Sequence, residues 1–147
     1  MRISYKRATV VRETNQGYCR PTLQAKISSA SDVYQHLAKY RDLEREHFVL
    51  ITLDGASRVI ETRVISIGTL NQSLVHPREV FRPAILDNAA GIIVAHNHPS
   101  GQVVPSLEDK RVTKRLKEVG VLMGIQLLDH VIVSSEGFSS LKEEGNI

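Results

Sequence analysis

The chain has 147 residues, of which 41% are hydrophobic and 24% charged, and its formal net charge is +3. This composition excludes an intrinsically disordered protein, and the length suffices for one domain with a single core. A single cysteine, Cys19, excludes an internal disulfide framework and a cysteine-based zinc site. No signal-peptide core and no membrane-spanning apolar stretch stands out, so we expect a cytoplasmic protein without a membrane partner.

The first half of the chain predicts one helix and one β-hairpin. Residues 1–27 are polar and weakly patterned, and we predict an N-terminal extension there with one strand at 8–12, ahead of a domain at 28–147. A helix is predicted to begin at Ser31 and Asp32 and to end at Leu43. The β-rich runs at 47–54 and 58–66 are joined by "DGAS", which is typical of a hairpin turn.

The second half predicts helices that alternate with strands. Pro77 fits the first position of a helix that we expect to reach Asn88, with Val80, Phe81, Ala84 and Ile85 facing inward. A strand follows at 91–98, and a helix over 105–120 is predicted to end at Gly120. Strands at 125–133 and 138–141 complete the pattern. The predicted fold is therefore an α/β domain with a mixed central sheet flanked by helices.

Two histidines stand one residue apart at the end of the apolar strand "GIIVAHNH". In an extended segment residues i and i+2 point to the same side, so His96 and His98 present two imidazoles together. Such a pair binds zinc well when a third protein ligand is available. Taken alone, the pair is weak evidence for a metal site, because two histidines near a loop are more often structural or incidental.

The helix that follows offers the third ligand. Val112, Leu116, Val119 and Met123 fall on one face of the helix, and Asp109 lies on that same apolar side. A carboxylate there needs a partner. Ser106 and Asp109 have the spacing of a capping box, and the alternative partner is a cation shared with both histidines. Two imidazoles, a carboxylate and an open position form the ligand set of a hydrolytic zinc centre.

The spacing of these residues resembles a known family. His96-x-His98, seven residues, Ser106, two residues and Asp109 match the JAMM metalloprotease motif, and the longer runs at 68–101 and 105–133 look like the RadC family within that superfamily. The resemblance implies a JAMM-type α/β fold with zinc held by His96, His98 and Asp109. Larger RadC proteins also carry an N-terminal helix-hairpin-helix region, for which this chain lacks room, so we expect a short form.

The resemblance also implies a glutamate that acts as general base and a serine that stabilises the oxyanion. Glu46 begins the first central strand, shares a face with Phe48 and Leu50, and is the position at which the family places its base. Glu79 is the alternative, although the helical pattern points it toward solvent. The implied serine is Ser106.

Three neighbouring polar residues have smaller predicted roles. Asn97 points away from the ligand side and is expected to hold a loop through backbone hydrogen bonds. His130 is expected to be a hydrogen-bonded structural histidine rather than a ligand, and Asp129 is a candidate to orient a ligand histidine.

Three classes of function remain. The first is a zinc-dependent hydrolase of peptide or isopeptide bonds with a protein or peptide substrate. The second is a DNA-associated repair factor, suggested by the family label and by a basic helix face. The third is a silent interaction module that keeps zinc for stability, which the intact motif disfavours. The basic face comprises Lys110, Arg111, Lys114, Arg115 and Lys117.

Overall fold

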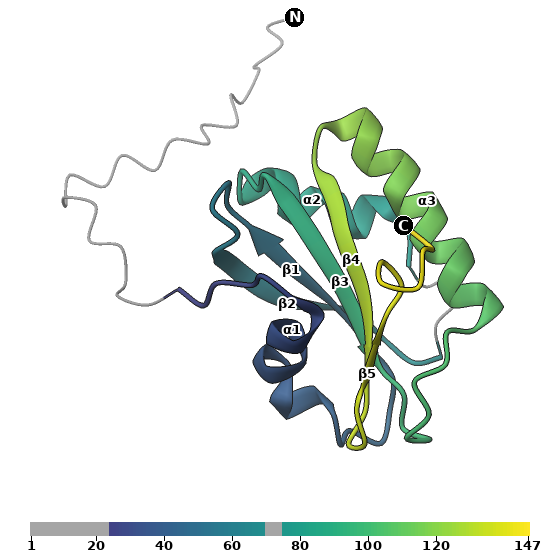
Figure 1. The fold of residues 1–147 in the computed structure, drawn as a ribbon. Helices are drawn as coiled ribbons and strands as arrows, with labels where there is room; N and C mark the ends of the chain where they lie inside the picture. Colours follow the sequence, from purple (N-terminus) through teal and green to yellow (C-terminus); the bar gives the residue numbers. More distant parts are fainter. Residues whose placement is uncertain (1–23, 70–74) are drawn as a thin grey trace, which may run out of the picture.

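A five-stranded sheet forms the centre of the computed structural model, which describes residues 24–69 and 75–147 (Figure 1). The strand order is β2-β1-β3-β4-β5. β3 pairs with β4 in parallel, whereas β1–β2, β1–β3 and β4–β5 are antiparallel. The mixed sheet is therefore confirmed, and the strand predicted at 8–12 lies outside the described residues. The strands are β1 (His47–Leu53), β2 (Val59–Ile67), β3 (Gly91–Asn97), β4 (Gln126–Val133) and β5 (Phe138–Ser140).

Helices cover both faces of the sheet (Figure 1). α2 (Pro77–Leu86) and α3 (Leu107–Met123) pack on the face that carries Phe48, Leu50 and Val94. α1 (Ala30–His36), followed by the short 3₁₀ helix η1 (Ala38–Tyr40), packs on the other face. Because β3 lies in the middle of the sheet, all seven of its residues are buried. No helix among the described residues is long and apolar enough to cross a membrane.

The hairpin turn between β1 and β2 forms as predicted. Asp54 Oδ1 accepts hydrogen bonds from the backbone nitrogens of Ala56 and Arg58, at 2.8 and 2.9 Å. An aspartate at the first position of a tight turn makes these bonds readily. The turn thus fixes the register of the two strands that lead toward Glu46 and Gly68.

The predicted ends of the first helix are wrong at both sides. α1 begins at Ala30 because Ser29, not Ser31, is its N-cap, with Asp32 completing the capping box. The helix ends at His36, and the chain continues as the 3₁₀ turn rather than as a helix to Leu43. α2 begins at Pro77 as predicted but ends at Leu86, two residues early.

The predicted end of the third helix at Gly120 is also wrong. α3 continues to Met123 and is capped by Gly124, whose φ of 67° lies in the left-handed region that favours glycine. Gly120 is needed for another reason: a Cβ there would lie 2.6 Å from the main-chain oxygen of Ile125. Glycine inside α3 therefore allows the chain to return closely alongside the helix into β4.

Two residues expected to face inward are instead exposed. Ile85 near the end of α2 is 47% exposed, and Met123 at the end of α3 is 45% exposed. Both stand in the last turn of a helix that extends past the edge of the core, where helical periodicity no longer implies burial. Val112 and Leu116 are buried as predicted, and Val119 packs against the core from a partly buried position.

Candidate metal centre

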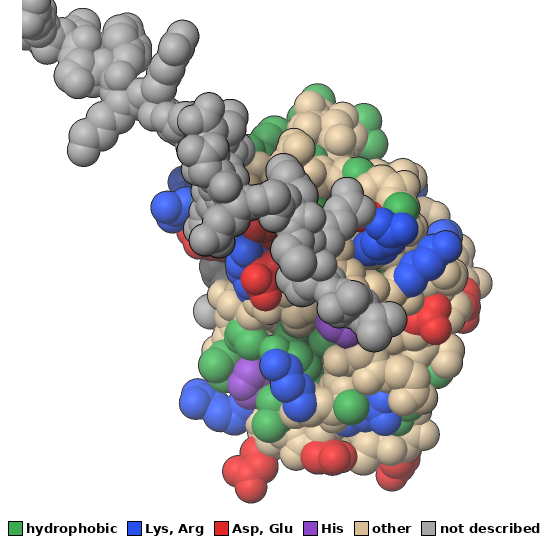
Figure 2. All heavy atoms as spheres, turned by 90° about the vertical axis from the view of Figure 1, so that its left-hand side faces the viewer, with side chains coloured by type: hydrophobic (Ala, Val, Ile, Leu, Met, Phe, Trp, Pro, Cys, Tyr) green, Lys and Arg blue, Asp and Glu red, His purple; other side chains and the backbone are tan. Residues whose placement is uncertain are grey.

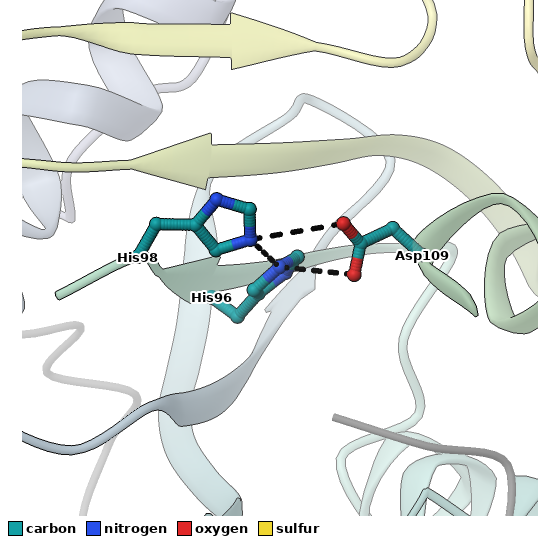
Figure 3. A group of neighbouring side chains, drawn as sticks. All are labelled: His96, His98 and Asp109. Carbon is teal, nitrogen blue, oxygen red and sulfur yellow. Dashed lines mark hydrogen bonds and ion pairs between the residues drawn. The ribbon is translucent and has the colours of Figure 1, made fainter. Parts of the chain in front are cut away.

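The C-terminal end of β3 places two histidines on the side of the sheet that α3 covers. His96 is 1% exposed and pairs across the sheet with Phe48, whose ring stacks near it at a centroid distance of 6.3 Å. His98 follows the strand, and its backbone nitrogen bonds to the Val133 oxygen at 2.9 Å. The two imidazoles therefore lie side by side, as strand alternation predicts (Figure 3).

Asp109 reaches the same point from the first turn of α3. Its Oδ2 accepts from the backbone nitrogen of Ser106 at 2.7 Å, and Ser106 Oγ accepts from the Asp109 nitrogen at 3.1 Å. The predicted capping box is thus present and holds the carboxylate in one orientation. Its Oδ1 is directed at His96 Nε2, 3.2 Å away. Asp109 caps the helix and still faces the histidines.

The three side chains bring their ligand atoms close enough together to share one metal ion. His96 Nε2 and His98 Nε2 are 2.9 Å apart, and the carboxylate oxygens of Asp109 lie 3.2 Å from the first and 3.7 Å from the second (Figure 3). Zinc with bonds of roughly 2.0–2.1 Å holds its ligands about 3.3 Å apart. These three residues form a group that could hold a metal ion. The geometry therefore fits a divalent cation.

The hydrogen bonding of His98 shows that its Nε2 carries a lone pair toward this point. His98 Nδ1 lies 2.7 Å from the main-chain oxygen of Gln102. A carbonyl oxygen only accepts, so Nδ1 must carry the hydrogen and neutral His98 leaves Nε2 unprotonated. A nitrogen lone pair that faces a buried carboxylate is compensated by a metal ion or by a proton at the same point.

The charge of the carboxylate is retained despite its burial. Burial alone would raise the pKa of Asp109, but the contacts with His96 and the two capping bonds with Ser106 hold that pKa well below its usual range. Asp109 is therefore an anion at neutral pH and is suited to bind a metal.

Comparison with known proteins gives the family of this fold and site. Residues 27–146 match the RadC-like JAB domain. The chain belongs to the RadC family. A UPF0758 protein of Rubrobacter xylanophilus is 55% identical over 120 residues, which cover 81% of this chain and 52% of the relative. UPF0758 proteins of Methanococcoides burtonii and Thermotoga maritima are 50% and 48% identical, with 83% of this chain and 54% and 55% of each relative covered. The chain thus spans about half the length of these curated relatives.

The open side of the centre in this RadC-like JAB domain is a surface cavity of about 580 Å³. Its lining includes His98 and Asp109 together with both residues predicted to act on a substrate, Glu46 and Ser106. His96 lies behind these residues in the core. The structure therefore brings all five predicted site residues to one place. The remaining lining residues are Thr69, Pro99, Ser100 and Glu108.

Asn97 holds the loop that carries Glu46. Its Oδ1 accepts from the His47 nitrogen at 2.7 Å, and its Nδ2 donates to the oxygens of Leu43 and Arg45 at 3.2 and 3.0 Å. Gly68 N donates to the Glu46 oxygen at 2.9 Å. The expected loop-holding role of Asn97 is confirmed, and these bonds fix the backbone on both sides of the glutamate.

The alternative base, Glu79, lies elsewhere in the RadC-like JAB domain. It is exposed on α2 and lines a different, mostly apolar groove between α2 and α3, along with Phe81 and Met123. Its position in the first turn of a helix is favourable to the helix dipole. Glu79 does not line the cavity that contains His98 and Asp109.

Two residues behind His96 were not predicted to support a ligand. His130 Nε2 lies 2.8 Å from His96 Nδ1, and His130 Nδ1 lies 2.6 Å from the hydroxyl of Thr113 on α3. Complete burial, and secondarily the nearby His96, lower the pKa of His130 well below its ordinary value, so it is neutral. The candidate role of Asp129 as orienting residue is wrong, because its carboxylate bonds to the Ser140 hydroxyl and to backbone nitrogens instead.

Proposed function

We propose that this domain is a zinc-dependent hydrolase that cleaves peptide or isopeptide bonds. The observation that carries the proposal is the convergence of His96 Nε2, His98 Nε2 and the Asp109 carboxylate beside a cavity lined by Glu46 and Ser106. Two imidazoles and one carboxylate are the ligand set of catalytic rather than structural zinc sites, because structural sites use four protein ligands. Bound zinc would polarise a carbonyl and lower the pKa of a water molecule to about 7.

The residues of this chain have distinct parts in the proposed reaction. Glu46 accepts a proton from the attacking water and passes it to the amine that leaves when the carbon–nitrogen bond breaks. Ser106 donates its hydroxyl hydrogen to the oxygen that gains negative charge on the attacked carbonyl carbon. Its oxygen can at the same time accept from the Asp109 nitrogen, because a hydroxyl both donates and accepts.

The test of this proposal is a pair of glutamate variants. We expect Glu46→Gln to bind zinc normally and to slow hydrolysis of a peptide library substrate by roughly 10²–10⁴-fold, which is the usual contribution of general acid–base catalysis. Glu79→Gln is the matched control and is expected to keep full activity. Zinc content and hydrolysis with and without a chelator are measured for each variant.

Two outcomes would contradict the proposed roles. Equal activity of Glu46→Gln and the wild-type domain would exclude Glu46 as the base. Hydrolysis that persists in a zinc-free His96→Ala variant would exclude metal-dependent chemistry at this centre.

Association with DNA is the second candidate, and the observation in its favour is the exposed basic face of α3. On another face of the molecule, at the left of Figure 1 and away from α3, Lys and Arg side chains are interspersed with Asp and Glu, so that face offers no comparable basic surface (Figure 2). If α3 binds DNA, affinity should fall steeply with salt and the triple change of Lys110, Lys114 and Lys117 to Glu should abolish it. We expect weak binding at ordinary salt. The exposed residues are Lys110, Arg111, Lys114, Arg115 and Lys117.

A further inference from the structure

A chain of hydrogen bonds behind the metal centre joins two of the candidate ligands. It runs from His96 Nδ1 to His130 Nε2 at 2.8 Å, from His130 Nδ1 to Thr113 Oγ1 at 2.6 Å, and from Thr113 Oγ1 to the main-chain oxygen of Asp109 at 2.6 Å. Three of the four residues are 0–1% exposed, and Asp109 is 2% exposed. Water therefore does not compete for these bonds.

The direction of every bond in this chain follows from its last acceptor. The Asp109 carbonyl oxygen has no hydrogen, so the Thr113 hydroxyl must donate its one hydrogen to it. Thr113 Oγ1 can then only accept from His130, which places the hydrogen of His130 on Nδ1. Neutral His130 consequently has a lone pair on Nε2 and accepts a hydrogen bond from His96 Nδ1.

The result is a single tautomer for His96. In the neutral ring its hydrogen lies on Nδ1, so Nε2 is the atom that faces His98 and Asp109 and is left for a metal ion or, in the metal-free domain, for a further proton. The opposite tautomer would place a hydrogen on Nε2, where it would block metal binding, and would leave two lone pairs facing each other between His96 and His130. In the assigned tautomer the facing lone pairs are those of His96 Nε2 and His98 Nε2, 2.9 Å apart beside the Asp109 carboxylate, where a metal ion or, in the metal-free domain, a proton compensates them. Residues that fix the tautomer of a ligand histidine typically alter metal affinity when they are changed.

We infer that Thr113 and His130 are positioning residues that hold His96 in its metal-binding tautomer through a hydrogen-bond chain anchored on the backbone of Asp109. The inference rests on the proposed function in one respect only, because the metal requires the Nε2 lone pair. The assignment of the hydrogens depends on the protein alone. It can therefore be tested without a substrate.

The first measurement is the tautomer of each imidazole in the metal-free wild-type domain, read by ¹⁵N NMR above the ordinary histidine pKa of about 6.5. We expect His96, His98 and His130 all to carry the hydrogen on Nδ1. A His96 or His130 ring without a hydrogen on Nδ1 would overturn the inference. This readout needs no variant and no bound metal.

The second measurement compares Co²⁺ affinity between threonine variants. Thr113→Val removes the acceptor for His130 Nδ1–H, so His130 is expected to shift its hydrogen to Nε2 and drive that of His96 to Nε2 as well. Co²⁺ affinity should fall 10–100-fold, and Thr113→Ser should restore it. Thr52→Val is the matched control, because Thr52 is also fully buried and its hydroxyl donates to Asp87 at 2.7 Å, in a network separate from the His96 chain.

Each result decides the inference. A loss of Co²⁺ affinity in Thr113→Val that is no larger than in Thr52→Val would overturn it, as would an unchanged His96 tautomer in Thr113→Val. If Thr113→Val fails to fold, the wild-type tautomers decide. Absence of hydrolytic activity would refute the proposed function while leaving the tautomers and the Co²⁺ affinities intact, so the two failures are distinguishable.

Discussion

Replacing Asp109 by Asn separates its helix-capping role from its metal-binding role, because α1 contains a matched control. Asp109 and Asp32 occupy the same position in two capping boxes. Their Oδ2 atoms accept from the N-cap nitrogens of Ser106 and Ser29 at 2.7 and 2.9 Å. Both serine hydroxyls accept in return, at 3.1 and 3.2 Å. Asp109 alone of the two lies beside two imidazoles.

The magnitude follows from the linkage between zinc binding and folding. Free zinc at 100 times its dissociation constant stabilises the folded state by about 2.7 kcal/mol. For a chain of this size, 1 kcal/mol shifts Tm by roughly 2–4 °C, so zinc should raise the wild-type Tm by about 5–11 °C. Asp109→Asn removes the charged ligand and should abolish this rise. Asp32→Asn should keep the rise, since that carboxylate contacts no imidazole.

The assay is scanning calorimetry of the three proteins with zinc and with a chelator. In the chelated state both variants lose part of a capping box, and we expect both to melt below the wild-type domain. The difference between zinc and chelator isolates the metal contribution. A zinc-induced rise in Asp109→Asn equal to that of the wild-type domain would refute the assigned ligand role, and so would loss of the rise in Asp32→Asn.

Three further predictions concern the framework of the domain. Burial alone would raise the pKa of Asp87, but hydrogen bonds from Arg63 and Thr52 lower it overall. The ionised carboxylate therefore stabilises the folded domain above the unfolded pKa of about 3.9, and this contribution to the free energy of unfolding is lost as the pH falls through the lower folded pKa. The gap in urea midpoint between the wild-type domain and Arg63→Met should therefore shrink below about pH 4, and a pH-independent gap would contradict this. Gly120→Ala should lower Tm, because the new Cβ would lie 2.6 Å from the main-chain oxygen of Ile125. Alanine inside a helix is normally more stable than glycine by about 1 kcal/mol, so an increased Tm would refute the close approach. Asn97→Leu should destabilise the domain by about 0.5–1.5 kcal/mol for each hydrogen bond lost, because the partly buried backbone groups of His47 and Arg45 lose their partner. A urea midpoint equal to wild type would show that those groups find other partners.

The strands were predictable from the sequence to within a residue at most ends. Apolar runs such as 91–97 are bounded by glycine or turn residues, and these local signals coincide with the observed limits. Helix ends were less predictable. The sequence offers serine caps at both Ser29 and Ser31, and glycines at both Gly120 and Gly124, and local pattern alone does not choose between them. Packing decides: Gly120 is required by the returning chain, and Gly124 by its positive φ.

The three candidate ligands were predictable because each follows from one local period. His96 and His98 share a strand face, and Asp109 lies on the apolar side of a helix that begins soon after. Glu46 is a different case. Its sequence position indicates a strand end, but its place in the cavity depends on Asn97, which holds the neighbouring backbone from another strand. Sequence periodicity predicts which side chains share a face of one strand or helix, but it does not predict a contact between two strands that are far apart in the sequence.

The partnership between His130 and His96 could not be predicted from alternation, because β4 contains a bulge. Ile92 pairs with Leu127, whereas the next residue of β3, Ile93, pairs with Asp129, so β4 contains one extra residue. Leu127 and His130 consequently both face α3, although strict alternation would place them on opposite sides. Bulges occur often beside functional sites, where they redirect a side chain. Here the extra residue turns His130 toward Thr113 and His96 and turns Asp129 away, so the residue that contacts a candidate ligand is His130 and not the candidate Asp129.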